Sequence, residues 1–210
     1  ECARLEQNNI KVMTIVGVAG TTETGNIDPL REMAVIAKQF KCHFHVDAAW
    51  GGATLLSNKY RSLLDGVELA DSVTIDAHKQ MYVPMMVYAS MHIISRPGYE
   101  LLVNQSIEKA KYFADLIKAD DDFELVSEPE LCLLTYRYVP QVVQKFLQTA
   151  EPAQQEDINV ILDKLTKFIQ KRQREAGKSF VSRTRIEVSH YHGRKVLVFR
   201  VVLANPLTTE

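Results

Sequence analysis

Two charged residues follow short apolar segments in the first half of the sequence. Asp47 ends a segment that begins at His43, and Lys79, with His78 directly before it, follows the run Ser72 to Ile75. An ionised carboxylate at a buried strand end costs free energy unless a positive charge faces it. An amine withdrawn from water can attack a carbonyl carbon. The two residues therefore suggest chemistry between a lysine and a carbonyl compound whose positively charged ring or group faces Asp47.

Each of these residues also has an ordinary interpretation. Asp47 could cap the turn that follows it, Ala48-Ala49-Trp50-Gly51-Gly52, and lysines such as Lys79 are common on protein surfaces. A third segment, Gly20-Thr21-Thr22, offers hydroxyl and backbone N–H groups that suit either a polar turn or a bound ligand. Taken singly, none of the three distinguishes the two interpretations.

The elements around these residues predict a parallel α/β sheet. Residues 11–18, 43–48 and 72–76 are β-rich and apolar, and the spacing between them leaves room for helices. Asp28 is a predicted N-cap, with Pro29 at the first helical position. Ligands of such sheets bind beyond the carboxyl ends of the strands. The threonine loop, Asp47 and Lys79 all fall at predicted strand ends, which favours the functional interpretation.

The second half has a different pattern and predicts a small α+β domain with an antiparallel sheet. A helix follows Pro97-Gly98, and strands are expected near 123–126 and 131–138. A helix over 157–176 ends at Gly177, and two more strands lie near 179–189 and 195–203. The inward face of the helix over 157–176 is predicted to carry Ile158, Ile161, Leu162, Leu165, Phe168 and Ile169.

Composition limits the classes of partner and compartment. The net charge of -1 gives no reason to expect nucleic acid or an acidic membrane surface as a partner. The cysteines, Cys2, Cys42 and Cys132, form no CxxC pair, which favours reduced thiols in the cytoplasm. The longest apolar stretch, residues 81–94, is shorter than the roughly 20 residues of a membrane-spanning helix.

Three segments in register resemble a known enzyme family. Gly20-Thr21-Thr22-Glu23-Thr24-Gly25, His45 to Gly52 and Asp71 to Lys79 are similar, in order and spacing, to the group II pyridoxal-phosphate-dependent amino-acid decarboxylases. That family includes glutamate, aspartate, aromatic amino-acid and diaminobutyrate decarboxylases, and the chain looks closest to bacterial glutamate- and aspartate-type members. The resemblance implies part of the large domain of a fold-type I, aminotransferase-like enzyme with a mainly parallel sheet, followed by a small α+β C-terminal domain.

The resemblance also implies a role for individual residues. Lys79 would form the Schiff base with pyridoxal 5'-phosphate, and Asp47 would pair with the pyridine N–H and keep it protonated. Ala49 would pack on the ring face, Thr21 would lie near the cofactor, and His78 would sit beside its phosphate and the lysine. The substrate would be an acidic L-amino acid, glutamate or aspartate, and the enzyme a cytoplasmic homodimer.

The chain departs from the family mainly in length. Members are more than twice as long, so residues 1–86 are expected to be a partial cofactor-binding domain and residues 87–210 the small domain. A segment is expected to be missing near 84–86, and the part that precedes residue 1 in the family, with most phosphate ligands and the residue stacked on the ring, is absent.

Three alternative assignments remain open at this point. Arg137 is a candidate for binding the substrate carboxylate, although a charged strand residue on a solvated face is an equally good interpretation. His43, His45 and Asp47 alternate along one strand and therefore share a face, as in a zinc metallohydrolase. The chain could also be a non-catalytic fragment that only dimerises.

Overall fold

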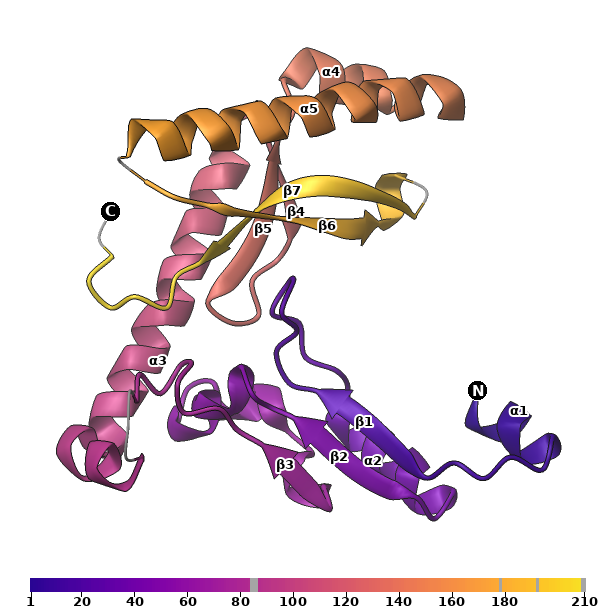
Figure 1. The fold of residues 1–210 in the computed structure, drawn as a ribbon, viewed down its shortest axis with the longest axis vertical. Helices are drawn as coiled ribbons and strands as arrows, with labels where there is room; N and C mark the ends of the chain where they lie inside the picture. The colour runs from indigo at the N-terminus through magenta and orange to yellow at the C-terminus, as the bar shows by residue number, and fades with distance from the viewer. Residues whose placement is uncertain (84–86, 178, 192, 209–210) are drawn as a thin grey trace. The chain divides into compact units, whose positions relative to one another are not determined.

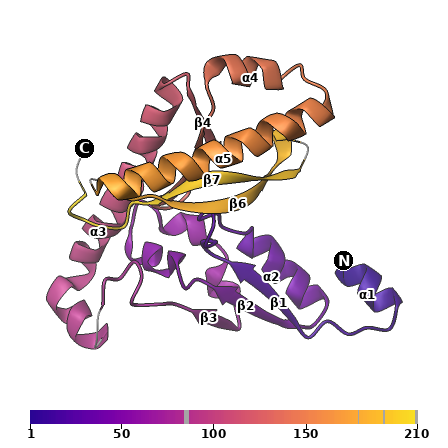
Figure 2. The same cartoon turned by 45° about the horizontal axis from the view of Figure 1, so that its top comes forward.

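The computed structural model describes residues 1–83, 87–177, 179–191 and 193–208 (Figures 1 and 2). The chain divides into two compact units, Glu1–Ser106 with Ala204–Glu210, and Ile107–Leu203. The sequence predicted a boundary at residue 86, but the division falls 20 residues later, inside a long helix. The segment predicted to be missing near 84–86 lies outside the described residues.

The first unit contains the predicted parallel sheet. Its strands are β1 (Thr14–Val18), β2 (His43–Asp47) and β3 (Ser72–Thr74), in the order β1-β2-β3. Helix α2 (Leu30–Gln39) connects β1 to β2, and short helix α1 (Cys2–Gln7) precedes the sheet. Three 3-10 turns, η1 (Gly51–Leu56), η2 (Arg61–Leu64) and η3 (Val67–Leu69), connect β2 to β3. The spacing between 48 and 72 predicted room for a helix, and the chain forms these three short turns there instead.

Helix α2 buries the predicted face against the sheet. Leu30, Ala34 and Ala37 are buried together with Phe44 and Val46 of β2. The other face of the sheet is more open, since the side chain of Val16 in β1 is 51% exposed. The apolar strand β1 is therefore covered on one face only in this chain.

Asp28 does not cap α2 as predicted. Its Oδ2 accepts the backbone N–H of Val18 at 2.8 Å, and its own N–H donates to the Val18 carbonyl at 2.9 Å. Pro29 occupies the N-cap position of α2. The carboxylate therefore closes the Thr21 loop onto the end of β1, a contact between residues ten apart that helix-capping rules do not anticipate.

Helix α3 (Val87–Ala119) joins the two units. It is kinked at Ser95, whose φ is 59°, just before Pro97. A proline ring cannot fit inside a regular helical turn, so the kink falls where the sequence predicted a helix start. Beyond the kink, the buried face of the helix is apolar and consists of Val103, Ile107, Ala110, Ala114 and Ile117.

The second unit is a helix–sheet–helix sandwich, and its antiparallel sheet has the strand order β4-β5-β7-β6. The strands are β4 (Phe123–Ser127), β5 (Leu133–Tyr138), β6 (Ser182–Val188) and β7 (Arg194–Val202), and the helices are α4 (Gln141–Leu147) and α5 (Pro152–Ala176). Figure 1 shows α5 lying along one face of the sheet. On the other face, Ala110 and Ile117 of α3 pack against Leu134, Tyr136 and Phe199.

Helix α5 confirms some of its predicted inward residues and contradicts others. Leu162 is buried, and Ile158, Leu165 and Ile169 pack partly against the cores. Ile161 and Phe168 are 61% and 60% exposed, so their predicted burial was wrong. The inward stripe instead includes polar residues, which the apolar pattern could not reveal, and they are Asn159, Asp163, Thr166 and Gln170. The helix begins five residues earlier than predicted, at a capping box between Glu151 and Gln154.

Candidate functional site

The carboxyl ends of the three parallel strands are joined by backbone hydrogen bonds. In the strand register, Val18, Asp47 and Thr74 lie side by side. One residue further on, the Ala19 N–H donates to the Asp47 carbonyl at 2.8 Å, and the Ala48 N–H donates to the Thr74 carbonyl at 2.9 Å. The three loops that the sequence singled out therefore begin at one edge of the sheet.

Asp47 points its carboxylate into the loop that follows β2. Its Oδ1 accepts the backbone N–H of Ala49 at 3.1 Å, which is the turn-capping contact considered from the sequence. The residue is half-buried and Ala48 beside it is fully buried. Within the described ranges no lysine, arginine or histidine forms an ion pair with Asp47. The Asp47 carboxylate therefore caps its turn, and it could also form an ion pair with a bound cation at the sheet edge.

Lys79 lies in a tight turn after β3. Oδ1 of Asp76 accepts the N–H of His78 at 2.8 Å, and the Lys79 N–H donates to the Asp76 carbonyl at 3.3 Å. The turn continues with the Tyr82 N–H donating to the Lys79 carbonyl at 3.1 Å. The side chain of Lys79 is 40% exposed and its Nζ is 3.8 Å from Oδ2 of Asp76. The expectation that the amine is withdrawn from water is therefore not met in this chain.

An apolar cavity lies beside the lysine turn in the first unit. Its volume is about 370 Å³. The residues around it are nearly all hydrophobic, and they are Gly52, Leu55, Leu56, Ile75, Ala77, Met81, Val87 and Met91. The tyrosine of the same turn, Tyr82, donates its hydroxyl to the carbonyl of Ala204. The lysine turn is thus packed on its apolar side while Lys79 and His78 remain exposed.

The threonine loop is closed by its own hydrogen bonds. The hydroxyls of Thr21 and Thr24 are 2.8 Å apart, and Thr21 Oγ1 also accepts the N–H of Asn26 at 3.2 Å. Gly25, with a φ of 76°, returns its N–H to the Thr21 carbonyl at 2.9 Å. The Thr21 hydroxyl therefore helps shape the loop, and the loop follows β1 at the same sheet edge as Asp47.

The histidines of β2 are engaged with β3 rather than with Asp47. Nε2 of His43 and Nδ1 of His45 both lie within hydrogen-bond distance of the Ser72 hydroxyl, at 2.7 and 2.8 Å. His45 Nε2 is also 3.3 Å from the hydroxyl of Thr74. In the part of the chain that the structure describes, no group of three or more His, Cys, Asp or Glu residues could hold a metal ion. The zinc alternative therefore has no structural support.

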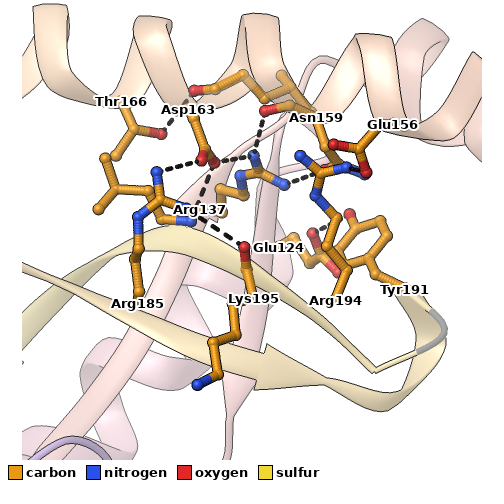
Figure 3. Close-up of polar contacts among 12 residues, drawn as sticks. Glu124, Arg137, Glu156, Asn159, Asp163, Thr166, Arg185, Tyr191, Arg194 and Lys195 are labelled. Carbon is orange, nitrogen blue, oxygen red and sulfur yellow. Dashed lines mark hydrogen bonds and ion pairs between the residues drawn. The ribbon is translucent and has the colours of Figure 1, made fainter.

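Arg137 is completely buried in the second unit, so its assignment as a substrate ligand was wrong, and so was its placement on a solvated face. Its guanidinium donates to Oδ1 of Asn159 at 2.5 Å and to Oδ1 of Asp163 at 2.9 Å (Figure 3). Burial lowers the pKa of Arg137 below its ordinary value, and the charge of Asp163 opposes this effect. The side chain holds α5 on the sheet.

The Asp163 carboxylate also contacts two other residues of the sheet. Its Oδ1 accepts the backbone N–H of Leu197 at 3.0 Å. Its Oδ2 is 3.0 Å from Nη2 of Arg185, as Figure 3 shows. Sequence reasoning missed this carboxylate. The available signal was the pair Asn159 and Asp163, four residues apart within the inward stripe of a helix, which predicts a buried polar partner on the facing strand.

Comparison with known proteins identifies the relatives of the chain. The family model described as the pyridoxal-dependent decarboxylase conserved domain matches residues 3–93. The aspartate 1-decarboxylase of Aliivibrio fischeri (strain ATCC 700601 / ES114) is 55% identical over 253 aligned positions, which include 99% of this chain and 46% of that protein. The chain thus spans less than half the length of this relative. Since the chain has 210 residues, at least 43 aligned positions (253 less 210) face gaps in it.

Two solved structures show the same fold. The crystal structure of mouse CSAD in its apo form is 24% identical, with a TM-score of 0.84 over 99% of this chain and 51% of that one. The glutamate decarboxylase domain of the diaminobutyrate-pyruvate transaminase and L-2,4-diaminobutyrate decarboxylase from Vibrio parahaemolyticus is 26% identical, with a TM-score of 0.79 over 99% of this chain and 45% of that one. The fold predicted from the sequence, fold-type I with a small α+β domain, is confirmed.

Proposed function

Because the chain belongs to the pyridoxal-dependent decarboxylase family, we propose that the protein containing it is a pyridoxal-phosphate-dependent carboxy-lyase that decarboxylates an L-amino acid. The observation that carries the proposal is the strand register: the residues that follow Val18, Asp47 and Thr74 emerge at one sheet edge. The site that we propose at this edge combines Asp47, which forms no ion pair with a lysine, arginine or histidine of the described ranges, with the exposed Lys79. This is the combination that the cofactor requires.

The residues present fit the cofactor. The half-buried carboxylate of Asp47 would be stabilised by a facing positive charge, and a protonated pyridine nitrogen carries one. The Ala49 N–H fixes the orientation of that carboxylate, and the Ala49 side chain would lie against the ring. Lys79 would attach covalently through Nζ, with His78 beside it. Thr21 shapes the adjoining loop. When bound, pyridoxal phosphate supplies an electron sink for the bond to the departing carboxyl group.

The proposed substrate is an acidic amino acid, and we favour aspartate over glutamate. The support is the name of the 55% identical relative, aspartate 1-decarboxylase. Release of labelled carbon dioxide from aspartate, glutamate, tyrosine and 2,4-diaminobutyrate would rank the substrates directly. Faster release from tyrosine than from both acidic amino acids would contradict the substrate class and leave the reaction type intact.

The test of the reaction itself is Lys79→Ala, with Lys111→Ala as a matched control on an exposed face of α3. We expect the first variant to lose the absorbance of covalently bound cofactor and all carbon dioxide release, and the second to keep both. If the unsubstituted protein acquires no cofactor absorbance, and Lys79→Ala changes nothing, the protein is a non-catalytic fragment.

We further propose that the protein is a homodimer in the cytoplasm. Three observations agree with this proposal: the free thiols of Cys2, Cys42 and Cys132, the sheet face around Val16 that the first unit leaves open, and the absence among the described helices of one long and apolar enough to cross a membrane. Light scattering coupled to size exclusion measures the oligomer, and a monomer mass at micromolar concentration would rule out the dimer. Fractionation of cells tests the location.

A further inference from the structure

Asp76 makes two contacts with the lysine turn. Through Oδ1 it accepts the N–H of His78 at 2.8 Å, which closes a turn two residues long. Through Oδ2 it faces Nζ of Lys79 at 3.8 Å. The same side chain therefore contacts both the backbone that carries the lysine and the amine at its tip.

The position of Asp76 explains why this arrangement matters. β3 ends at Thr74, and the chain turns within a few residues, so that Lys79 follows the strand end that pairs with Asp47. The lysine side chain is 40% exposed, so packing alone does not fix it. The hydrogen bond that the His78 N–H donates to Oδ1 of Asp76 fixes the backbone of the turn and so supplies the orientation that packing does not.

We propose that Asp76 is a positioning residue for Lys79, which holds the turn so that the amine is presented to the aldehyde of pyridoxal phosphate. This inference rests on the function proposed above. An amine in a fixed place reacts faster than one that samples many rotamers, and a misplacement of about 1 Å costs up to about 100-fold in rate. Asp76 acts through Lys79 and takes no part in bond making.

Two substitutions separate the hydrogen-bond acceptor of the Asp76 side chain from its negative charge. Asp76→Ala removes both the acceptor for the His78 N–H and the carboxylate, whereas Asp76→Asn keeps an acceptor of the same shape. The matched control is Asp120→Ala in the second unit, where Oδ1 accepts the N–H of Asp122 at 3.0 Å in the same kind of turn. The control loses an equivalent contact far along the chain from the lysine.

The readout is the attachment of pyridoxal phosphate to Lys79. Condensation of Nζ with the aldehyde forms a C=N bond and releases one water, and borohydride then adds hydride to the carbon, with a proton taken up by the nitrogen. Mass spectrometry of the peptide that contains Lys79 gives the rate at which this stable adduct accumulates. Hydrogen–deuterium exchange of the same peptide without cofactor reports whether the His78 N–H is still held.

We expect Asp76→Ala to slow labelling of Lys79 by about ten-fold and to speed exchange of its peptide. We expect Asp76→Asn to recover labelling to within about three-fold of the unsubstituted rate, with exchange near normal. Asp120→Ala should match the unsubstituted protein in both. Equal labelling rates for Asp76→Ala and the unsubstituted protein, or no recovery by Asp76→Asn, would overturn the inference. Failure of the unsubstituted protein to form any adduct on Lys79 would instead refute the proposed function.

Discussion

Asp163→Asn is the substitution that most directly tests how the second unit holds α5. The side chain of Asp163 is 8% exposed and that of Arg137 is fully buried, with the two joined at 2.9 Å. Asparagine keeps the shape and one acceptor oxygen but removes the negative charge. Arg137 would then be a buried cation that has lost the charge at hydrogen-bond distance, with Asn159, the new amide and the Tyr191 ring as neighbours and the charge of Glu124 beyond them.

The expected cost follows from the burial of the pair. Removing one partner of a buried ion pair destabilises a protein by about 3–5 kcal/mol, because the remaining charge is left uncompensated. A matched comparison uses the other arginine on the same carboxylate: Arg185 is 50% exposed and pairs with Asp163 at 3.0 Å. Solvent screens that pair, so Arg185→Gln should cost about 0.2–1 kcal/mol. Arg137→Met removes the other member of the buried pair but leaves Asp163 with Arg185 and the Leu197 N–H, so it should cost about 1–3 kcal/mol, mainly for the Asn159 oxygen left without its donor.

Urea unfolding followed by circular dichroism gives the three free energies, provided that the m-value of each variant is unchanged. The predicted order of cost is Asp163→Asn, then Arg137→Met, then Arg185→Gln. A cost for Asp163→Asn below about 1 kcal/mol would show that the buried guanidinium needs no charged partner. An equal cost for Arg185→Gln and Asp163→Asn would mean that Asp163 stabilises the unit through the exposed Arg185. That result would refute the argument that the buried pair with Arg137 contributes most.

Three further outcomes are expected. Asp47→Asn should lower kcat for decarboxylation by about 100-fold, because loss of one member of the proposed charge pair between Asp47 and the pyridine nitrogen costs about 2–5 kcal/mol. Steady-state assays check this prediction, and an unchanged kcat would show that Asp47 is not part of the site. Gly66→Ala should destabilise the first unit by about 2–3 kcal/mol, because Gly66 has a φ of 97° and an added Cβ would lie 2.6 Å from Cα of Arg31. Thermal unfolding measures this loss of stability, and an unchanged Tm would contradict the predicted strain. Asp28→Ala should cost about 1–3 kcal/mol by leaving the Val18 N–H without its acceptor, whereas a cost within about 0.5 kcal/mol would mean that water replaces the carboxylate.

The candidate site could be predicted from the sequence because its signals are local. Each strand is a short apolar run, and the side chains that matter come directly after it. Parallel pairing then brings the loops after β1, β2 and β3 to one edge, as the Val18, Asp47 and Thr74 register confirms. Three features that were ambiguous singly together make a candidate site, because ligands of parallel sheets bind beyond the carboxyl ends of the strands.

The features that the sequence did not reveal depend on contacts between distant segments. Arg137 lies in β5, and its partners Asn159 and Asp163 lie more than 20 residues later in α5. A charged residue within a strand gives no sign of which layer covers it. The boundary between the two units is also set by contacts between distant segments. The hydrogen bond between Ser57 and Asn104 holds the first part of α3 on the first unit, so that unit continues past residue 86.

The two cations that the sequence proposed for chemistry, Arg137 and Lys79, differ in a way that separates stability from reactivity. Arg137 is fully buried and bound to a carboxylate and an amide at hydrogen-bond distance, so moving it would cost the free energy of a desolvated ion pair. Lys79 is 40% exposed and has one carboxylate, that of Asp76, at 3.8 Å. The contacts of Arg137 fix α5 on the sheet, whereas the longer and more exposed contact of Lys79 leaves its amine able to move, as the proposed covalent attachment of a cofactor requires. The buried arginine is therefore suited to anchoring the helix, and the exposed lysine to the chemistry proposed for it.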